Sequence, residues 1–290
     1  MFEILKNLDK RWVYLLMLVS IVVTIYIVNK TGKTFTEVVT PLTQSFFDEI
    51  DQLEKGDIVL LSLNYDPGSF GELSPMSNAV AYHCAARGAK LCFQTTMPMA
   101  PEMIADVITK VIKSDFPNWK YGEDYVNIGF KPGFEGVMKV IVTDLRELYT
   151  TDHQGTNIDD IPMLANIHSA QDFDLIVDIS TTSSVSWWAL YAATPYPETI
   201  RLIAGCTGVV APEVYPYIPA QCKGLLAAIK GAAEYEQLVM SKYGGESPRG
   251  VFSEARRRMA PQLVAHILII LLVILANIIF FVEKKREQHQ

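Results

Sequence analysis

The sequence predicts a doubly wound α/β domain, Rossmann-like or flavodoxin-like, with a mostly parallel five-stranded sheet, between two transmembrane helices. Three observations predict it. Two apolar segments near the ends of the 290-residue chain each have the length that a membrane-crossing helix needs. Between them, short continuous apolar runs alternate with segments of helical spacing. Strands that are apolar on both faces indicate a parallel sheet covered on both sides by helices.

The first apolar segment is RWVYLLMLVSIVVTIYIV, residues 11–28. Trp12 and Tyr26 stand near its two edges, where aromatic rings favour the membrane interface. The sequence after it, NKTGKT, contains no A-x-A cleavage pattern, which favours an uncleaved anchor over a signal peptide. We therefore expect a basic tail at 1–11, a transmembrane helix at 12–28, and a linker with a leading helix at 29–55.

The α/β domain is expected at residues 56–244. The predicted strands are Asp57–Leu63, Ala89–Thr95, Asp124–Phe130, Asp172–Ser180 and Glu198–Cys206. The helical segments are 74–88, with Ser74 as cap and Pro75 at the first position, then 100–113, 134–149, 183–193 and 221–244. Residues 150–171 break this alternation and indicate a long loop or a helical insertion. No internal repeat is present.

Ligands bind such sheets beyond the carboxyl ends of the strands, at the point where the strand order reverses. Six polar residues in or beside those loops are therefore ligand-binding candidates: Asp66, Thr95, Lys131, Glu135, Asp178 and Thr207. Asp178 lies inside an apolar run, so we expect it to pair or to face the crevice. The hydroxyl groups that follow it are suited to capping a helix, or to holding an anion at the helix N-terminus.

The glycine-rich stretch GFKPGFEG, residues 129–136, resembles a phosphate loop only loosely. Its glycines match neither G-x-G-x-x-G nor G-x-x-x-x-G-K-[ST]. A tight strand-to-helix turn is the favoured interpretation, and Lys131 and Glu135 remain candidates because they stand at a strand's carboxyl end.

No residue pattern indicates a catalytic site, a cofactor or a metal. The five histidines are scattered, and the four cysteines form no CxxC pair. Cys206, with a histidine as base, is the one nucleophile considered, but a thiol at the end of a buried strand is more often inert packing. The net charge of −7 and the lack of a basic aromatic surface argue against nucleic acid as a partner.

Small residues recur every four positions in CKGLLAAIKGAAEYE. If this stretch is one helix, they form a flat ridge that another backbone can approach closely. The ridge residues are Gly224, Ala228, Gly231 and Ala232. The ridge serves either close packing on the domain's own sheet or a contact with another subunit.

The second apolar segment follows a basic juxtamembrane linker at 245–259. It is expected to cross the membrane over 260–282 and to end in a charged tail at 283–290, and Pro261 stands where a helix can begin. Gln262 and His266 are four residues apart, and Asn277 lies about three turns further along close to the same face.

A polar stripe of this kind is costly against lipid and usually faces protein or water. We therefore treat Gln262, His266 and Asn277 as interface candidates, with Ser20 and Thr24 of the first span as their simplest partners. For His266 the alternative is a position at the membrane interface, with its ring reaching toward water.

Charge does not decide the orientation by itself. Six basic residues flank the spans on the side of the termini and six on the side of the central domain. The usual dominance of the first span places the termini inside and the central domain outside the cytoplasm.

The chain resembles a family of two-span prokaryotic membrane proteins that has no assigned activity. The resemblance rests on SLNYDPGSFGELSPM, YVNIGFKPGFEGVM, YTTDHQGTNIDDIPML, DFDLIVDIS, GLLAAIKGAAEYE and the final span opening MAPQLVAH. It covers nearly the whole chain and implies the same architecture and a prokaryotic origin, but no chemistry and no site residues.

Two functions follow from these features. We favour a non-enzymatic, membrane-anchored α/β module, a scaffold-like subunit that assembles with itself or with other membrane proteins in the lipid bilayer. The alternative is a small-molecule-binding or hydrolytic domain with its site at the carboxyl ends of the strands.

Overall fold

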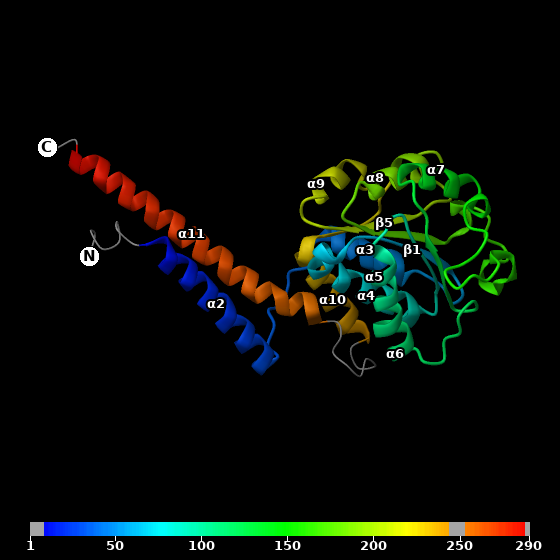
Figure 1. The fold of residues 1–290 in the computed structure, drawn as a ribbon, viewed down its shortest axis with the longest axis horizontal. Coiled ribbons are helices and arrows are strands. Elements are labelled where there is room, and N and C mark those ends of the chain that lie inside the picture. Colours follow the sequence, from blue (N-terminus) through cyan, green and yellow to red (C-terminus); the bar gives the residue numbers. More distant parts are fainter. Residues whose placement is uncertain (1–8, 244–252, 288–290) are drawn as a thin grey trace. The chain divides into compact units, whose positions relative to one another are not determined.

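The computed structural model describes residues 9–243 and 253–287, so the predicted basic tail and juxtamembrane linker lie largely outside the described residues. The chain divides into two compact units. One unit, Glu37–Ala255, holds the α/β sheet, and the other holds Met1–Thr36 and Arg256–Gln290 with the two long apolar helices (Figure 1).

The sheet has six parallel strands in the order β3-β2-β1-β4-β5-β6, which is the Rossmann-like order. Its strands are β1 Ile58–Asn64, β2 Lys90–Thr95, β3 Tyr125–Phe130, β4 Leu175–Ser180, β5 Leu202–Cys206 and β6 Leu225–Ala227. All five predicted strands are confirmed, and β6 is an additional short edge strand. The central strands β1 and β4 are almost wholly buried, which explains their apolar sequences.

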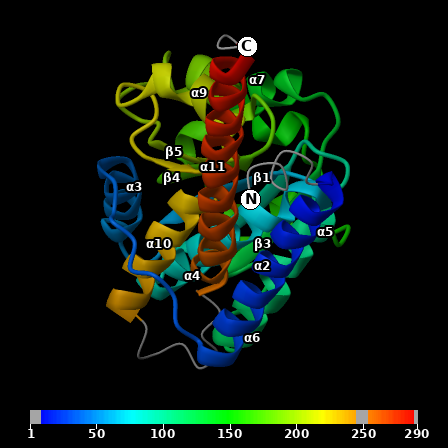
Figure 2. The same cartoon turned by 90° about the vertical axis from the view of Figure 1, so that its left-hand side faces the viewer.

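Helices cover both faces of the sheet (Figures 1 and 2). On one face, α4 packs against α3, α5 and α10, while on the other α7 packs against α8, and α8 against α9. These helices are α3 Pro41–Asp51, α4 Phe70–Arg87, α5 Ala100–Val107, α7 Glu135–Thr143, α8 Ser184–Trp188, α9 Ala211–Val214 and α10 Ala228–Tyr243. Helix α5 continues through a π-helical turn, Ile108–Ile112, into the short α6, Lys113–Asp115.

The helix predicted from Ser74 begins earlier than expected. A 3-10 turn, Pro67–Ser69, leads directly into α4 at Phe70, so Ser74 and Pro75 lie inside the helix and Ser74 is not its cap. Asp66 caps the 3-10 turn, because its side chain accepts a hydrogen bond from Ser69 N, and α4 then begins after Ser69 without a side-chain cap. The predicted stop at Gly88 is confirmed, with the left-handed backbone that ends many helices.

The single helix predicted over 221–244 is wrong in its first part. Leu225–Ala227 forms β6, and α10 begins only at Ala228. Gly224 therefore precedes a strand and shares no helical face with Gly231.

Both glycines nevertheless lie in tight contacts inside the domain. A Cβ atom at Gly224 would stand 2.4 Å from Phe46 N, and one at Gly231 would stand 2.9 Å from the Leu226 backbone. Within this chain Gly224 is thus packed closely against α3 and Gly231 against β6, and the contact with another subunit stays a prediction.

Residues 150–171 form an insertion of turns rather than a regular helix. Three 3-10 turns lie within and just after it, at Ile158–Asp160, Pro162–Leu164 and Ala170–Asp172. The start of the insertion runs beside the edge strand β3, since His153 N donates to Asn127 O at 2.9 Å. This contact covers an edge that would otherwise offer unpaired backbone groups.

The second unit contains α2 Lys10–Thr31 and α11 Glu254–Glu287, and both are long and apolar enough to cross a membrane. At 1.5 Å per residue, α2 measures about 33 Å and α11 about 51 Å, so α11 exceeds the roughly 30 Å hydrocarbon layer. Because α11 starts at Glu254, Pro261 lies inside the helix and not at its first turn as predicted.

Candidate functional site

A buried polar network lies at the reversal point of the strand order, between β1 and β4. Ser62 and Asp178 face each other across these two strands in register, and Asn64 and Ser180 pair at their carboxyl ends. All four side chains are buried. Buried polar groups therefore lie at the place where the sequence predicted a ligand-binding crevice.

The carboxyl group of Asp178 is the centre of this network. It accepts hydrogen bonds from Ser62 Oγ at 2.5 Å, from Asn64 Nδ2 at 2.9 Å and from the Ser184 hydroxyl. Burial raises the pKa of Asp178 to about 6, against an ordinary value of 3.8, although these donors oppose the shift. Asp178 thus pairs with neutral donors, one of the two outcomes expected for it.

The network extends along β2 toward the adjoining loop. Asn64 Oδ1 accepts from Thr96 N at 2.9 Å and from Thr95 Oγ1 at 3.3 Å. Through Asn64, the structure joins two predicted site residues, Thr95 and Asp178. Gln94 Nε2 donates to Ser62 Oγ at 2.6 Å, and Tyr149 Oη donates to Gln94 Oε1 at 3.3 Å.

Lys131 stands beside this network, and Glu135 does not. The Lys131 ammonium lies 5.3 Å from the centre of the Tyr149 ring, and Lys131 N donates to Thr95 O at 3.0 Å. Glu135 instead pairs with Lys139 at 2.6 Å and accepts a hydrogen bond from the Tyr191 hydroxyl. The stretch GFKPGFEG is a tight turn, since Gly133 and Phe134 both have positive φ angles.

Asp66 and Thr207 lie in turns at the same edge of the sheet. Asp66 caps the 3-10 turn before α4, and Thr207 O accepts from Val210 N and Ala211 N. Neither side chain joins the Asp178 network in the described structure.

The residues at the start of α4 do not fit the dinucleotide that this strand order holds in many proteins. A pyrophosphate would occupy the helix N-terminus after β1. Here Asp66 already accepts from Ser69 N, and Glu72 Oε2 accepts from Gly208 N at 3.2 Å. Two carboxylates at this place would repel a pyrophosphate.

The cysteines are buried and free. Burial raises the pKa of Cys206 to about 12, with a further contribution from Cys222 and nearby carboxylates, so its thiol stays protonated near neutral pH. Among the described residues, no group of three or more metal-ligating side chains is assembled.

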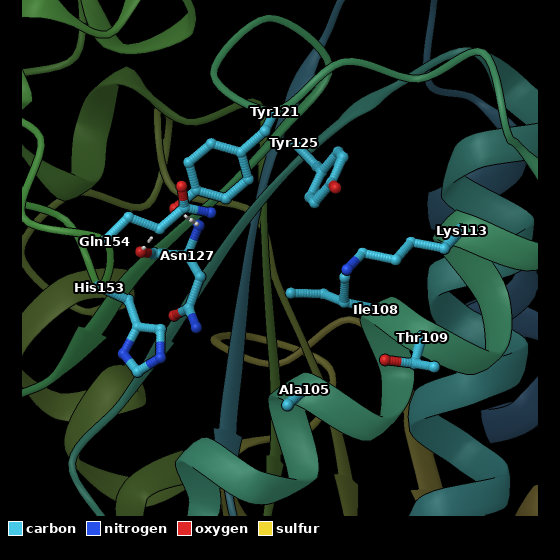
Figure 3. A pocket seen from close by; sticks show the side chains of 9 residues that line it. All are labelled: Ala105, Ile108, Thr109, Lys113, Tyr121, Tyr125, Asn127, His153 and Gln154. Carbon is cyan, nitrogen blue, oxygen red and sulfur yellow. Dashed lines mark hydrogen bonds between the residues drawn. The ribbon is translucent and has the colours of Figure 1, made fainter.

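A separate cavity, open to solvent and lined by both polar and apolar groups, lies beside the edge strand β3, and the sequence reasoning missed it. Its volume is about 170 Å³. Figure 3 shows Lys113 reaching in from the helical side, with Asn127 and His153 across the opening from it. The lining residues are Ala105, Ile108, Thr109, Lys113, Tyr121, Tyr125, Asn127, His153 and Gln154.

A β-bulge helps to shape this cavity. Phe93 of β2 pairs with Asn127, but Gln94 pairs with Gly129, so Ile128 is the extra residue on β3. Gly129 has a φ of +91°, and its amide donates to Asn127 Oδ1 at 3.0 Å. The Asn127 side chain, only 5% exposed, is thereby held in the cavity wall.

Four polar residues that the sequence reasoning missed share one signal, a polar side chain inside an apolar strand. Ser62 and Asn64 interrupt β1, Gln94 interrupts β2 and Asn127 interrupts β3. The same signal had singled out Asp178. Applied to every strand, it would have found both the network and one wall of the cavity.

The interface candidates on α11 are exposed within the single chain. Gln262, His266 and Asn277 all present their side chains to the surroundings, and Asn277 Nδ2 donates to Val273 O of its own helix at 2.8 Å. On α2, the Ser20 and Thr24 hydroxyls likewise donate to carbonyls one turn earlier. The pairing expected between these two groups of residues stays a prediction.

No protein-family model and no curated protein matches this sequence. Among solved structures, the crystal structure of levodione reductase matches with 14% identity, over 64% of this chain and 84% of that chain, at a TM-score of 0.26. A likeness this low supports no inference about activity. The parallel sheet and the two apolar helices expected from the sequence are present.

Proposed function

We propose that this protein is a non-enzymatic, membrane-anchored α/β module that acts as a subunit of a homo- or hetero-oligomeric membrane assembly. Both α2 and α11 cross the bilayer in this proposal, and the central domain lies on the extracytoplasmic side. The observation that carries it is the set of exposed polar side chains at Gln262, His266 and Asn277 in the otherwise apolar part of α11, residues 260–282.

A carboxamide or imidazole exposed to lipid is unfavourable, so such groups usually face another helix or water. Asn277 satisfies only part of its hydrogen-bonding capacity through Val273 O, because its Oδ1 still accepts no hydrogen bond in the described structure. A neighbouring helix in an assembly would supply the missing donor. Gln262 and His266, which lie nearer the central domain in sequence, likewise need hydrogen-bond partners.

The chemistry at the strand ends supports a non-enzymatic role. Asp178 is fully buried and accepts hydrogen bonds from three side chains, and Glu135 is engaged by Lys139 and Tyr191. The hydroxyls that bond to Asp178 belong to Ser62 and Ser184, which are buried with it, so this pairing offers no accessible nucleophile.

Native mass spectrometry after gentle detergent extraction tests the assembly. We expect the parent protein to run as an oligomer or as a complex with other membrane proteins. Asn277→Leu and His266→Leu should each lower the yield of that species while membrane insertion stays intact, because interhelical hydrogen bonds in membranes average only about 0.6 kcal/mol.

Ile278→Leu is the matched control, since Ile278 is an exposed apolar neighbour of Asn277 on α11. A parent protein found only as a monomer would contradict the proposal. So would equal yields of the assembled species from the parent, the two polar variants and the control.

A second candidate function, binding of a small molecule at the strand ends, is favoured by Lys131. Its ammonium stands beside the Asp178 network and makes no ion pair among the described residues. A small molecule retained by the parent in the same spectra, and lost in Lys131→Met, would support this function.

A further inference from the structure

The cavity beside β3 has an unbalanced set of polar groups. Of its nine lining residues, Lys113 carries a positive charge and none carries a carboxylate. Asp152 immediately precedes the lining residue His153. Its carboxylate accepts hydrogen bonds from Tyr121 Oη, Gln154 N and Thr156 N, each at 2.8 Å. That carboxylate is therefore held by three neutral donors, and it is not among the groups that line the cavity.

Asn127 offers an unused donor inside the cavity. Gly129 N donates to Asn127 Oδ1, and this bond fixes which end of the carboxamide is the oxygen. The Nδ2 group then points away from Gly129, and among the described residues it donates to no other group. Nδ2 is not among the fully buried atoms that lack a partner, so this donor is open to a water or a ligand in the cavity.

Lys113 is a free cation in the described structure, in contrast to Lys110 one turn earlier. Lys110 pairs with Asp106 at 2.9 Å, whereas no carboxylate is paired with Lys113 Nζ. The Lys113 side chain extends toward the strand, on the side of the cavity opposite Asn127 (Figure 3). Both donors therefore border the same cavity.

The remaining lining combines aromatic and aliphatic surface with the polar residues Thr109, His153 and Gln154. Tyr121 and Tyr125 form an edge-to-face pair with their centroids 5.3 Å apart, and Ala105 and Ile108 add aliphatic surface. A cavity of about 150 Å³ accommodates benzene in another protein. The 170 Å³ here therefore suits a ligand of about the size of one aromatic ring with a small polar group.

We propose that this cavity is a binding site for a small organic carboxylate with a flat, apolar body. The carboxylate accepts hydrogen bonds from Lys113 Nζ and Asn127 Nδ2, and the body lies against Tyr121 and Tyr125. This site is distinct from the strand-end network and does not depend on the assembly proposed above.

Fluorine NMR of 4-fluorobenzoate tests the site, with the full chain in lipid nanodiscs and empty nanodiscs as the blank for partitioning. We expect saturable binding with a dissociation constant on the order of 1 mM. The neutral counterpart 4-fluorobenzamide should bind at least about tenfold more weakly, because it lacks the charge that Lys113 attracts.

Two variants locate the binding. Lys113→Met should raise the dissociation constant of 4-fluorobenzoate at least about tenfold. Asn127→Asp keeps the acceptor for Gly129 N but replaces the free donor with a negative charge, so it should abolish measurable binding. Lys110→Met, on the same helical segment but outside the cavity, should bind like the parent.

Melting curves confirm that each variant is folded before its binding is compared. The proposal is overturned if the parent shows no saturable binding above empty nanodiscs, or if 4-fluorobenzamide binds as tightly as 4-fluorobenzoate. Equal binding by the parent and Lys113→Met, or equal losses in Lys113→Met and Lys110→Met, overturns it too. If Asn127→Asp does not fold, Lys113→Met and the neutral ligand still decide the outcome.

Discussion

Asp178 brings a carboxyl group into the centre of the sheet, and the groups that bond to it are hydroxyls and an amide rather than cations. Neutral donors stabilise a buried carboxylate only in part, so its ionisation is shifted upward. The same residue therefore carries a measurable pH dependence of stability.

We expect Asp178→Asn to flatten that dependence. The pKa of Asp178 is about 6 in the folded protein and 3.8 in the unfolded chain. Between these values the folded state binds a proton that the unfolded state has released, so the contribution of Asp178 to stability falls as pH rises from about 4 to 6. The difference should reach on the order of 2–3 kcal/mol.

Thermal unfolding of the detergent-solubilised chain at pH 4, 5, 6 and 7 measures this effect. Relative to the parent, Asp178→Asn should gain stability from pH 4 to about pH 6 and then level off towards pH 7. Asp160→Asn, at an exposed position, should follow the parent. A constant difference between parent and Asp178→Asn would show that the carboxyl group does not titrate in this range.

His83 should make the stability of the folded protein depend on pH in the opposite direction. It is buried, stacks on Phe47 with centroids 4.5 Å apart, and its Nδ1 lies 2.8 Å from Tyr235 Oη. Burial lowers the pKa of His83 to about 4, against an ordinary 6.5. As pH falls from 6.5 through 4, the unfolded state takes up a proton first, so this stability is lost on acidification.

His83→Asn should therefore lower the melting temperature at pH 7, through lost ring packing, yet lose less on moving to pH 5 than the parent loses. Melting curves at the two pH values check both parts. His168→Asn, at an exposed position, is the control. An unchanged acid sensitivity in His83→Asn would contradict the assignment.

At the scale of single residues, the sequence predicted Asp178 better than its partners. A charged group inside an apolar run is conspicuous, whereas Ser62, Asn64 and Gln94 are ordinary polar interruptions until strand order places them side by side. The cavity beside β3 was harder still. Lys113 and Asn127 are brought together by a helix, a bulged edge strand and an insertion that no local pattern connects.

At the scale of elements, the misreading of β6 has a physical reason. The segment Leu225–Ala227 is too short for period-2 alternation to be visible, and the alanines around it favour helix. Tertiary pairing with β5 overrides that preference. Ala228 turns the chain into α10 with a φ of +55°, a conformation that no propensity for alanine would predict.

We expect Gly231→Leu to destabilise the domain by about 1–3 kcal/mol, because any side chain there meets the Leu226 backbone. Denaturant unfolding of the solubilised chain measures it. Gly136→Ala is the matched control in α7, since a Cβ there meets nothing within 4 Å and alanine favours helix. A Gly231→Leu protein as stable as the parent would remove the argument for a tight contact.

At the scale of the whole molecule, alternation of apolar strands with helices was enough to predict a doubly wound parallel sheet between two apolar helices. The sequence left Rossmann-like and flavodoxin-like orders open, because both fit the same alternation. Long-range pairing decides between them, and it places β1 between β2 and β4.

The orientation of the molecule is testable with the native cysteines in place, since all four are buried. We expect Glu123→Cys, in the central domain, to react with an impermeant maleimide in intact cells. Lys284→Cys, near the end of α11, should react only after lysis. Both positions are exposed. The reverse pattern would place the central domain in the cytoplasm, and the unsubstituted protein gives the background.

The pairing of β1 with β4 also has a consequence for folding during synthesis, because β1 is made well before β4. Ser62 and Asp178 are separated by 116 positions. At about 5–20 residues per second, a ribosome needs on the order of 10 s to extend the chain from one to the other. During that interval β1 lacks its β4 neighbour, and an unpaired apolar strand is prone to wrong pairing. We expect the nascent chain to be most in need of a chaperone in this interval, after α2 has been made and before α11 exists.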